Sequence, residues 1–295
     1  MKIIPYFFAL FSLLGMASCD IINPEEQIPS YIIVEPITLT TDIGEGTSSA
    51  KITEAWVFVD ADFVGAYSLP ATIPVLYEGT HTLRIQAGIH DNGINSVPEI
   101  YPFYETFEAT VELSPDTETV IAPTIGYLPD TEFAYIEDFE SGEHLFMDDR
   151  DFDADTKIDI TTDDVFEGRQ GGKIVLTPDN PFIDVATNLD RLFSGLQEDQ
   201  VYVYVEVNYK SDVPVLWGVI GYDDNLLSTP VPTYDPGFNA KDEWNKIYFN
   251  FSSILFNADF AGYQFGLTAV LPSENGAFTT DRAEILLDNI KIVHF

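Results

Sequence analysis

The sequence predicts an all-β protein with two domains. From residue 31 onward, most segments are rich in β-branched and aromatic residues and alternate between apolar and polar positions, as half-buried strands do. Gly, Pro and Asp interrupt these segments at short intervals, which is typical of β-sandwiches. Residues 31–128 contain no convincing amphipathic helix.

Residues 1–18 have the composition of a signal peptide. A lysine follows Met1, and the apolar run after it is too short and too early for a comfortable membrane span. The lone cysteine, Cys19, comes directly after two small residues, Ala17 and Ser18. This arrangement resembles a bacterial lipoprotein signal, which implies cleavage after residue 18 and acylation of Cys19, with palmitate among the chains. The alternative is an ordinary signal peptide and a buried free cysteine.

Residues 19–30 read as a tether, because they hold two prolines and several acids and show no periodicity. Acids soon after the cysteine resemble the export signal of some Bacteroidetes lipoproteins. The resemblance implies a lipid-anchored protein of the outer membrane, on the cell surface or otherwise on the periplasmic face. With a single cysteine the chain forms no intrachain disulfide, so packed cores must stabilise it.

The chain is strongly acidic, with 49 Asp and Glu against 13 Lys and Arg and a formal net charge of -36. Phosphate groups would repel such a chain, which argues against nucleic-acid binding. An anionic membrane would repel it too, so a lipid anchor must hold it there. The charge suits a solvated domain, cation binding or a neutral ligand such as a sugar.

The first domain is expected over residues 31–128 as an immunoglobulin-like β-sandwich. In "AWVFVD", Val57 and Val59 share one strand face, opposite Trp56 and Phe58. The stretch 57–88 resembles the PEGA family of small surface β-domains, although the tetrapeptide itself is replaced by "LPAT". The residues that fit the pattern are Gly65, Pro70, Gly79, His81, Leu83 and Ile85. The resemblance implies a fold and no catalytic residues. His81 lies in a predicted strand, so a satisfied structural role is the expectation and metal binding is the alternative.

The second domain is expected over residues 129–295, after a linker in "YLPDTEFAY" (127–135). Its ends, "IEDFESGEHLF" and "AEILLDNIKIVHF", resemble the first and last strands of carbohydrate-binding modules with a galactose-binding-like jelly roll. Residues 201–222 read as two long strands, in agreement with that fold. The whole arrangement resembles uncharacterised Bacteroidetes lipoproteins.

Aromatic residues near predicted loops and strand ends form a candidate sugar platform, since Trp and Tyr stack on the apolar faces of sugar rings. The segment 221–244 is expected to be a long, Pro-rich loop that forms the binding rim. The alternative for each tryptophan is core packing. The candidate ligand-binding residues are Trp217, Tyr222, Tyr234 and Trp244.

Calcium is a candidate cofactor, because modules of this kind often hold a structural Ca²⁺ between their first and last strands. The resemblance places Glu140 and Asp288 at the ligand-bearing ends, and a hard cation prefers six to eight oxygen ligands. The alternative is that Asp288 caps a strand and Glu140 is solvated. The acidic run 149–159 resembles a calcium loop but lacks the Gly and the terminal acid of an EF-hand, which favours a solvated loop.

The sequence shows no catalytic signature. It contains no Gly-x-Ser-x-Gly elbow and no His-Glu-x-x-His motif, and the spacing of Glu137, Asp138 and Glu140 misses the paired carboxylates of jelly-roll glycosidases. We therefore expect a non-catalytic, lipid-anchored envelope protein that binds a glycan or a protein partner through its jelly roll. The alternatives are a structural accessory subunit of an outer-membrane complex and a glycoside-active enzyme.

Overall fold

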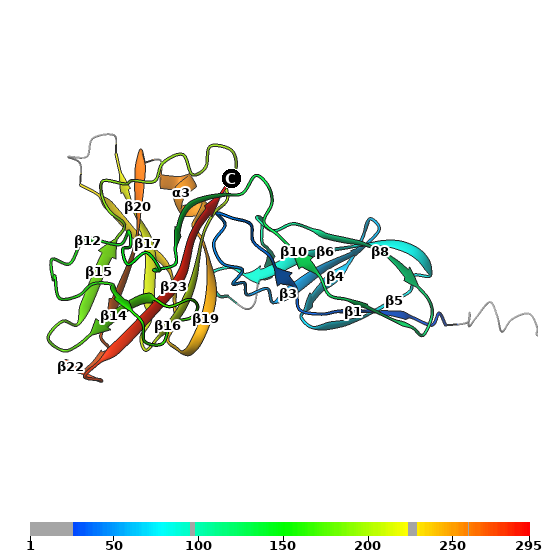
Figure 1. Cartoon of the computed structure of the whole chain (residues 1–295), viewed down its shortest axis with the longest axis horizontal. Coiled ribbons are helices and arrows are strands. Elements are labelled where there is room, and N and C mark those ends of the chain that lie inside the picture. Colours follow the sequence, from blue (N-terminus) through cyan, green and yellow to red (C-terminus); the bar gives the residue numbers. More distant parts are fainter. Residues whose placement is uncertain (1–25, 95–97, 224–228, 259) are drawn as a thin grey trace, which may run out of the picture.

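The computed structural model describes residues 26–94, 98–223, 229–258 and 260–295. It consists of two β-sandwiches that lie end to end (Figure 1). The one α-helix among the described residues is α3 (Ser252–Ala258). No helix in this part of the chain is long and apolar enough to cross a membrane. The prediction of an all-β chain with a sandwich followed by a jelly roll is confirmed.

The N-terminal sandwich is built from a three-stranded and a five-stranded sheet around one apolar core. The smaller sheet has the order β5-β1-β9, in which β1 is parallel to β9 and antiparallel to β5. The larger has the order β4-β3-β6-β7, with β8 also paired to β6, while β2 and β10 form a separate pair. The strands are β1 (Ser30–Val34), β2 (Thr38–Leu39), β3 (Glu54–Val59), β4 (Asp62–Ser68), β5 (Ala71–Val75), β6 (Gly79–His90), β7 (Pro98–Ile100), β8 (Phe107–Leu113), β9 (Glu118–Ile121) and β10 (Thr124–Ile125).

Alternation in the sequence predicts the buried face of this sandwich correctly. Val57 and Val59 on β3 are fully buried, whereas Trp56 and Phe58 on the opposite face are partly exposed. His81 has the structural role that was expected, because its Nδ1 lies 2.7 Å from Asp60 Oδ2 and its Nε2 lies 3.1 Å from the carbonyl oxygen of Glu78.

The jelly roll packs a six-stranded sheet against a five-stranded one. The first has the order β13-β14-β23-β16-β19, with β11 also paired to β23, and the second has the order β12-β15-β20-β17-β18. The strands are β11 (Glu132–Glu137), β12 (Asp148–Asp149), β13 (Asp159–Thr161), β14 (Gly171–Leu176), β15 (Phe182–Ala186), β16 (Val203–Ser211), β17 (Val215–Tyr222), β18 (Val231–Phe238), β19 (Lys241–Asn250), β20 (Gly262–Val270) and β23 (Ala283–His294), with a small hairpin of β21 (Ser273–Glu274) and β22 (Ala277–Phe278).

The first strand of the jelly roll lies earlier than the sequence analysis placed it. β11 begins at Glu132, inside the expected linker, and ends at Glu137. Phe139 has a positive φ of 57°, which stops extended backbone, so the Phe-Glu pair of residues 139–140 follows the strand instead of forming it. The buried ring of Phe139 explains why this stretch is apolar without being a strand.

The Pro-rich segment expected to be a loop contains a strand. β18 holds Pro232 and Pro236 and pairs only with β17, at the edge of its sheet. Proline is tolerated on an edge strand because no second neighbour needs its missing N–H. Residues 224–228 of the predicted rim lie outside the described residues.

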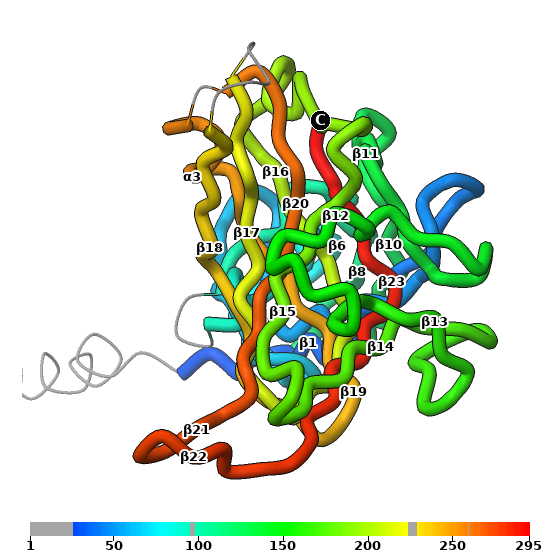
Figure 2. The backbone as a smooth tube through the Cα atoms, turned by 90° about the vertical axis from the view of Figure 1, so that its left-hand side faces the viewer, coloured from blue at the N-terminus to red at the C-terminus, as the bar shows by residue number. Residues whose placement is uncertain are grey.

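The two sheets of the jelly roll have very different outer faces. The N-terminal sandwich lies against the outer face of β16, β19 and β23, where Tyr204, Tyr248 and Val293 join its apolar core (Figure 1). We name this the covered face. The outer face of β12, β15, β20, β17 and β18 points away from that contact and toward the viewer in Figure 2. We name it the open face.

A buried ionic network lies on the covered face. The carboxylate of Glu206 on β16 lies 2.7 Å from Lys246 Nζ, and its other oxygen accepts hydrogen bonds of 2.8 and 2.9 Å from the hydroxyls of Tyr101 and Tyr127. Burial acts to raise the pKa of Glu206, but the charges of Lys246 and Lys291 outweigh it and hold this pKa below its ordinary value. Burial lowers the pKa of Lys291 to about 8. The two domains therefore share a charged, desolvated interface.

Candidate ligand-binding face

Alternation along the three central strands, β15, β20 and β17, decides which side chains lie on the open face. Ile183, Trp217 and Phe265 point into the core between the sheets, so their strand neighbours point outward. On β15 the outward residues include Phe182 and Asp184. The same rule directs the polar and apolar residues described below to one surface.

Two glycines leave the middle of this face without side chains. Gly218 on β17 lies opposite Gly266 on β20. A Cβ at Gly218 would lie 2.3 Å from the carbonyl oxygen of Thr233, so no side chain fits there. The side chain of Tyr234 on β18 uses this space, and its hydroxyl donates a hydrogen bond to Asp184, on the far side of β17 and β20. Its ring therefore lies across the sheet.

Arg150, directly after β12, is at the centre of the polar groups. Its backbone N–H donates to the carbonyl oxygen of Asp184 at 2.9 Å. Its guanidinium lies 3.5 Å from Asp184 Oδ1 and 3.7 Å from Asp148 Oδ2. Its Nε is buried and forms no hydrogen bond of good geometry with a described residue. The guanidinium is thus held in place between two carboxylates with part of its hydrogen-bonding capacity unused.

Gln264 and Tyr222 complete the polar cluster. Gln264 Nε2 donates to Asp148 Oδ2 at 3.0 Å, and the hydroxyl of Tyr222 donates to Gln264 Oε1. Burial raises the pKa of Asp184 against the opposing hydrogen bond from Tyr234 and the charge of Arg150. We refer to these six side chains as the polar cluster: Asp148, Arg150, Asp184, Tyr222, Tyr234 and Gln264.

An exposed apolar strip adjoins the polar cluster. Phe182 is 42% exposed, Leu216 is 47% exposed and Val270 is 58% exposed. Phe182 lies opposite Val270 in the pairing of β15 with β20, and Leu216 lies opposite Thr268, two residues before Val270. The open face therefore presents hydrocarbon surface beside fixed donors and acceptors, the combination found in small-molecule and sugar sites.

The structure brings together two of the four residues predicted to form a sugar platform. Tyr222 and Tyr234 both belong to the polar cluster, but Tyr222 is buried and only Tyr234 is partly exposed. Trp217 is fully buried between the sheets against Phe146 and Phe249, so it offers no surface to a ligand and is removed from the site. Trp244 lies on β19, in the other sheet, where its Nε1 donates to Asp164 at 3.0 Å.

Sequence reasoning missed Arg150, Asp184 and Gln264. A signal exists for Asp184, because it is the polar residue between Ile183 and Val185 in a short alternating strand. Arg150 is the one cation in the acidic run 148–155, which makes it the counter-ion of that run. Gln264 carries no local signal, since only the fold places it beside Asp148.

The residues predicted to hold calcium bind backbone instead. Glu140 Oε1 accepts hydrogen bonds from the N–H groups of Arg169 and Gln170, the latter at 2.9 Å. Asp288 Oδ2 accepts one from the N–H of Glu167 at 3.1 Å. No group of three or more His, Cys, Asp or Glu among residues 26–94, 98–223, 229–258 and 260–295 could hold a metal ion. The calcium site stays a prediction.

The acidic run after β12 likewise serves local turns. Asp149, Asp151 and Asp153 accept hydrogen bonds of 2.8, 2.9 and 3.1 Å from the N–H groups of residues two or three positions later. Such side-chain-to-backbone bonds are typical of Asx turns. This arrangement agrees with the solvated acidic loop that the sequence favoured.

Comparison with known proteins finds similar folds and no family. No protein-family model matches the sequence, and no curated protein is similar to it. Among solved structures, the CBM22-1 xylan-binding domain of Paenibacillus barcinonensis Xyn10C has a TM-score of 0.36 and 17% identity, covering 55% of this chain and 93% of that one. The CBM22-2 domain of the same protein has a TM-score of 0.40 and 12% identity, covering 55% and 99%.

A family 30 carbohydrate-binding module of a Clostridium thermocellum cellulosomal cellulase gives a TM-score of 0.36 and 10% identity, covering 54% of this chain and 89% of that one. These neighbours are carbohydrate-binding modules. At such scores the likeness does not decide the ligand of this chain, which has to be argued from its own side chains.

Proposed function

We propose that this protein is a non-catalytic binding protein whose open face binds a glycan. The observation that carries the proposal is the joining of the polar cluster and the exposed apolar strip on one sheet face that the N-terminal sandwich does not cover, with Arg150, Asp184 and Tyr234 partly exposed. The covered face has similar outward residues, but the N-terminal sandwich occupies it. One face thus serves assembly, and the other is available to a ligand.

The chemistry of the open face matches that of a sugar chain. Sugar rings present flat C–H surfaces that pack on side chains such as Phe182 and Leu216. Their hydroxyls both donate and accept hydrogen bonds, so a binding face needs both kinds of partner. Arg150 supplies donors and Asp184 supplies an acceptor, and their mutual contact fixes both before a ligand arrives, which lowers the entropy lost on binding.

We further propose that Cys19 carries the lipid anchor that holds the protein in the outer membrane. Cys19 lies outside the described residues, and the proposal rests on the sequence alone. Growth with labelled palmitate should label the wild-type protein and leave the Cys19→Ala variant unlabelled. Proteolysis of intact cells would then distinguish the cell surface from the periplasmic face. Unlabelled wild-type protein would contradict the anchor.

A glycan array with the purified protein tests binding. We expect a defined set of neutral glycans to bind, and Arg150→Ala and Phe182→Ala to weaken this binding by about tenfold or more each, as loss of roughly 1.4 kcal/mol implies. The matched control is Phe278→Ala on β22, because Phe278 is exposed to the same extent as Phe182, 42% for both. This control should bind as the wild type does.

Three outcomes would contradict the proposal. Absence of any glycan binding, together with a membrane protein that co-purifies in stoichiometric amount, would favour the accessory-subunit alternative. Glycan binding that is unchanged in both Arg150→Ala and Phe182→Ala would show that the binding site is not on the open face. Turnover of a bound glycan, abolished by Asp184→Asn, would make the protein a glycoside-active enzyme.

A further inference from the structure

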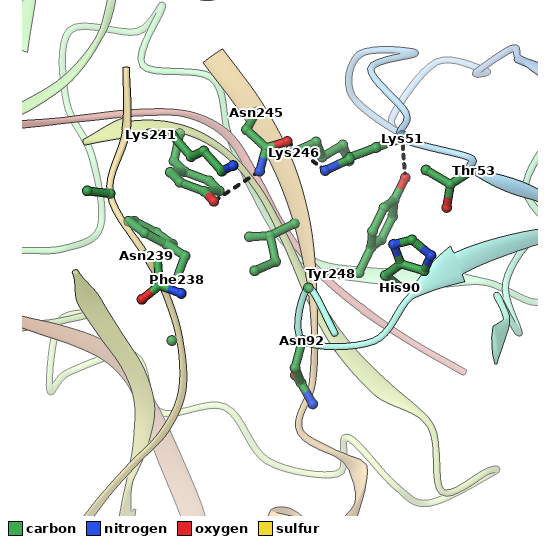
Figure 3. A pocket seen from close by; sticks show the side chains of 15 residues that line it. Lys51, Thr53, His90, Asn92, Phe238, Asn239, Lys241, Asn245, Lys246 and Tyr248 are labelled. Atoms are coloured by element: carbon green, nitrogen blue, oxygen red, sulfur yellow. Dashed lines mark hydrogen bonds between the residues drawn. The ribbon is translucent and has the colours of Figure 1, made fainter. Parts of the chain in front are cut away.

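A cavity lies between the two domains, away from the polar cluster of the open face. It has a volume of about 320 Å³, and Figure 3 shows it from close by. The N-terminal sandwich contributes Lys51, Thr53, His90 and Asn92. The jelly roll contributes residues of β16, β18 and β19 and the segment that joins β18 to β19. A ligand in this cavity would touch both domains. We refer to it as the interdomain cavity.

The interdomain cavity has the opposite charge to the rest of the chain. Three lysines line it, Lys51, Lys241 and Lys246, and none of its lining residues is Asp or Glu. The chain has only 13 Lys and Arg among 295 residues, against 49 acids. A lining set drawn from an average part of this sequence would be acidic. The cavity therefore brings together three of the few basic residues of the chain.

Two of the three lysines lack a counter-ion among the described residues. Lys246 is paired with Glu206, and His90 Nε2 lies 2.7 Å from Glu54 Oε1, so carboxylates behind the wall compensate these two groups. Lys51 and Lys241 form no ion pair within the described part of the chain. Lys51 Nζ instead donates to the amide oxygen of Asn245 at 2.7 Å.

These two lysines are close enough to repel each other. Burial lowers the pKa of Lys51, and the neighbouring charge of Lys241 lowers it further. Like charges placed together without a counter-ion destabilise a fold unless something else binds between them. An anion in the cavity would remove this repulsion.

The remaining wall combines buried aromatic rings with neutral polar groups. The rings of Tyr209 and Phe238 stack on each other with centroids 3.8 Å apart and planes 12° from parallel, and both are buried, so they form a rigid apolar wall behind the cavity. Asn239 and Thr53 add neutral polar groups at the edge of the cavity (Figure 3). The volume falls in the range of small-molecule sites, at its lower end.

We propose that the interdomain cavity binds a small oxyanion-bearing ligand through Lys51 and Lys241, with the carboxylate of an acidic sugar or a free inorganic oxyanion as its source. The ligand would contact both domains and so strengthen their contact. The proposal does not depend on glycan binding by the open face, because the cavity shares no lining residue with the polar cluster or the exposed apolar strip.

Titration calorimetry of the full chain tests this proposal with four probes: glucuronate, inorganic phosphate, inorganic sulfate and glucose. We expect saturable binding of at least one anion that weakens as salt rises, and none of glucose. Lys51→Gln and Lys241→Gln should each weaken that binding by about tenfold. The control is Lys157→Gln, an exposed lysine of the jelly roll outside the cavity, which changes net charge equally and should have no effect.

The probes also separate the two sources. Tighter binding of glucuronate than of the inorganic anions identifies an acidic sugar, and the reverse order identifies a free oxyanion; both support the site. Absence of saturable anion binding would overturn the proposal. Equal binding of glucose, or unchanged anion binding in the double lysine variant, would overturn it as well. Since the substituted lysines are exposed, unfolding of the variants is not expected to obscure the result.

Discussion

The open and covered faces of the jelly roll have the same alternating residue pattern, but only the covered face is buried by the N-terminal sandwich. Both consist of the outward positions of alternating strands, and both mix aromatic, charged and amide side chains. On the covered face, the N-terminal sandwich buries Glu206 completely, together with Tyr204 and Tyr248. On the open face, Asp184 and Tyr234 stay partly exposed, whereas Tyr222 and Gln264 are buried by other parts of the jelly roll. The comparison shows that the neighbour of a sheet, and not its own sequence, decides whether its polar outer face becomes core or surface.

Breaking the ion pair on the covered face should have the largest effect on stability. Glu206→Gln leaves the buried charge of Lys246 without its partner, which costs about 3–5 kcal/mol when an ion pair is fully desolvated. Urea unfolding measures the change. The double variant Glu206→Gln, Lys246→Met removes both charges and should recover part of the loss.

The matched change on the open face is Asp184→Asn. Its partner Arg150 keeps access to water and to Asp148, so the cost should be about 1 kcal/mol or less. Equal losses at Glu206 and Asp184 would show that the two faces do not differ in solvation, and the comparison between them would fail.

A pair of valines gives a smaller contrast without charge. Val293 on β23 is fully buried in the covered face, and Val270 on β20 is 58% exposed on the open face. Val293→Ala should cost about 2 kcal/mol through lost burial and the space left behind. Val270→Ala should change the free energy of unfolding by less than about 0.5 kcal/mol. Similar losses in the free energy of unfolding for the two variants would contradict the exposure of Val270 on the open face.

A pH dependence of stability also belongs to the covered face. Burial lowers the pKa of Lys291 to about 8 in the folded state, from 10.5 in the unfolded chain. Between these values the unfolded state binds more protons, so stability rises with pH across this window as the cost of a buried charge disappears. Comparison of wild type with Lys291→Met between pH 8 and 10 should show this rise in the wild type alone.

The raised pKa values of Tyr101, Tyr104 and Tyr127 act in the opposite direction as the pH approaches 10, where tyrosine ionises in the unfolded chain. Wild type and Lys291→Met share these tyrosines, so the tyrosine contribution cancels in the difference between the two pH profiles. A wild type and variant with parallel pH profiles between pH 8 and 10 would contradict the burial of a charged Lys291.

The alternation of apolar and polar residues was enough to predict most strands, but it did not predict how the strands pack against one another. The long strands within residues 201–222 and the buried positions Val57 and Val59 follow from period-two alternation, a property of a few neighbouring residues. β18 was missed because its Pro and Gly residues indicate a loop. A strand with these residues is tolerated here because β18 lies at the edge of its sheet.

The site was predicted in part for the same reason. Tyr222 and Tyr234 were found as aromatic residues near strand ends. The sequence alone does not show on which side of its strand Trp217 lies, and the structure shows that it points into the core between the two sheets. Arg150 and Asp184 meet because β12 pairs with β15, a contact between segments more than 30 residues apart. No local rule reports such a contact.

The pairing of β1 has a mechanical consequence. β1 is the first described strand, it starts at the end of the molecule farthest from the open face, and it is bonded along its length to β5 on one side and to β9 on the other (Figure 1). If the chain is held by its N-terminus, as we propose, tension from a ligand on the open face pulls β1 along its own axis. Both ladders are then loaded in shear, so their hydrogen bonds share the force and must break together.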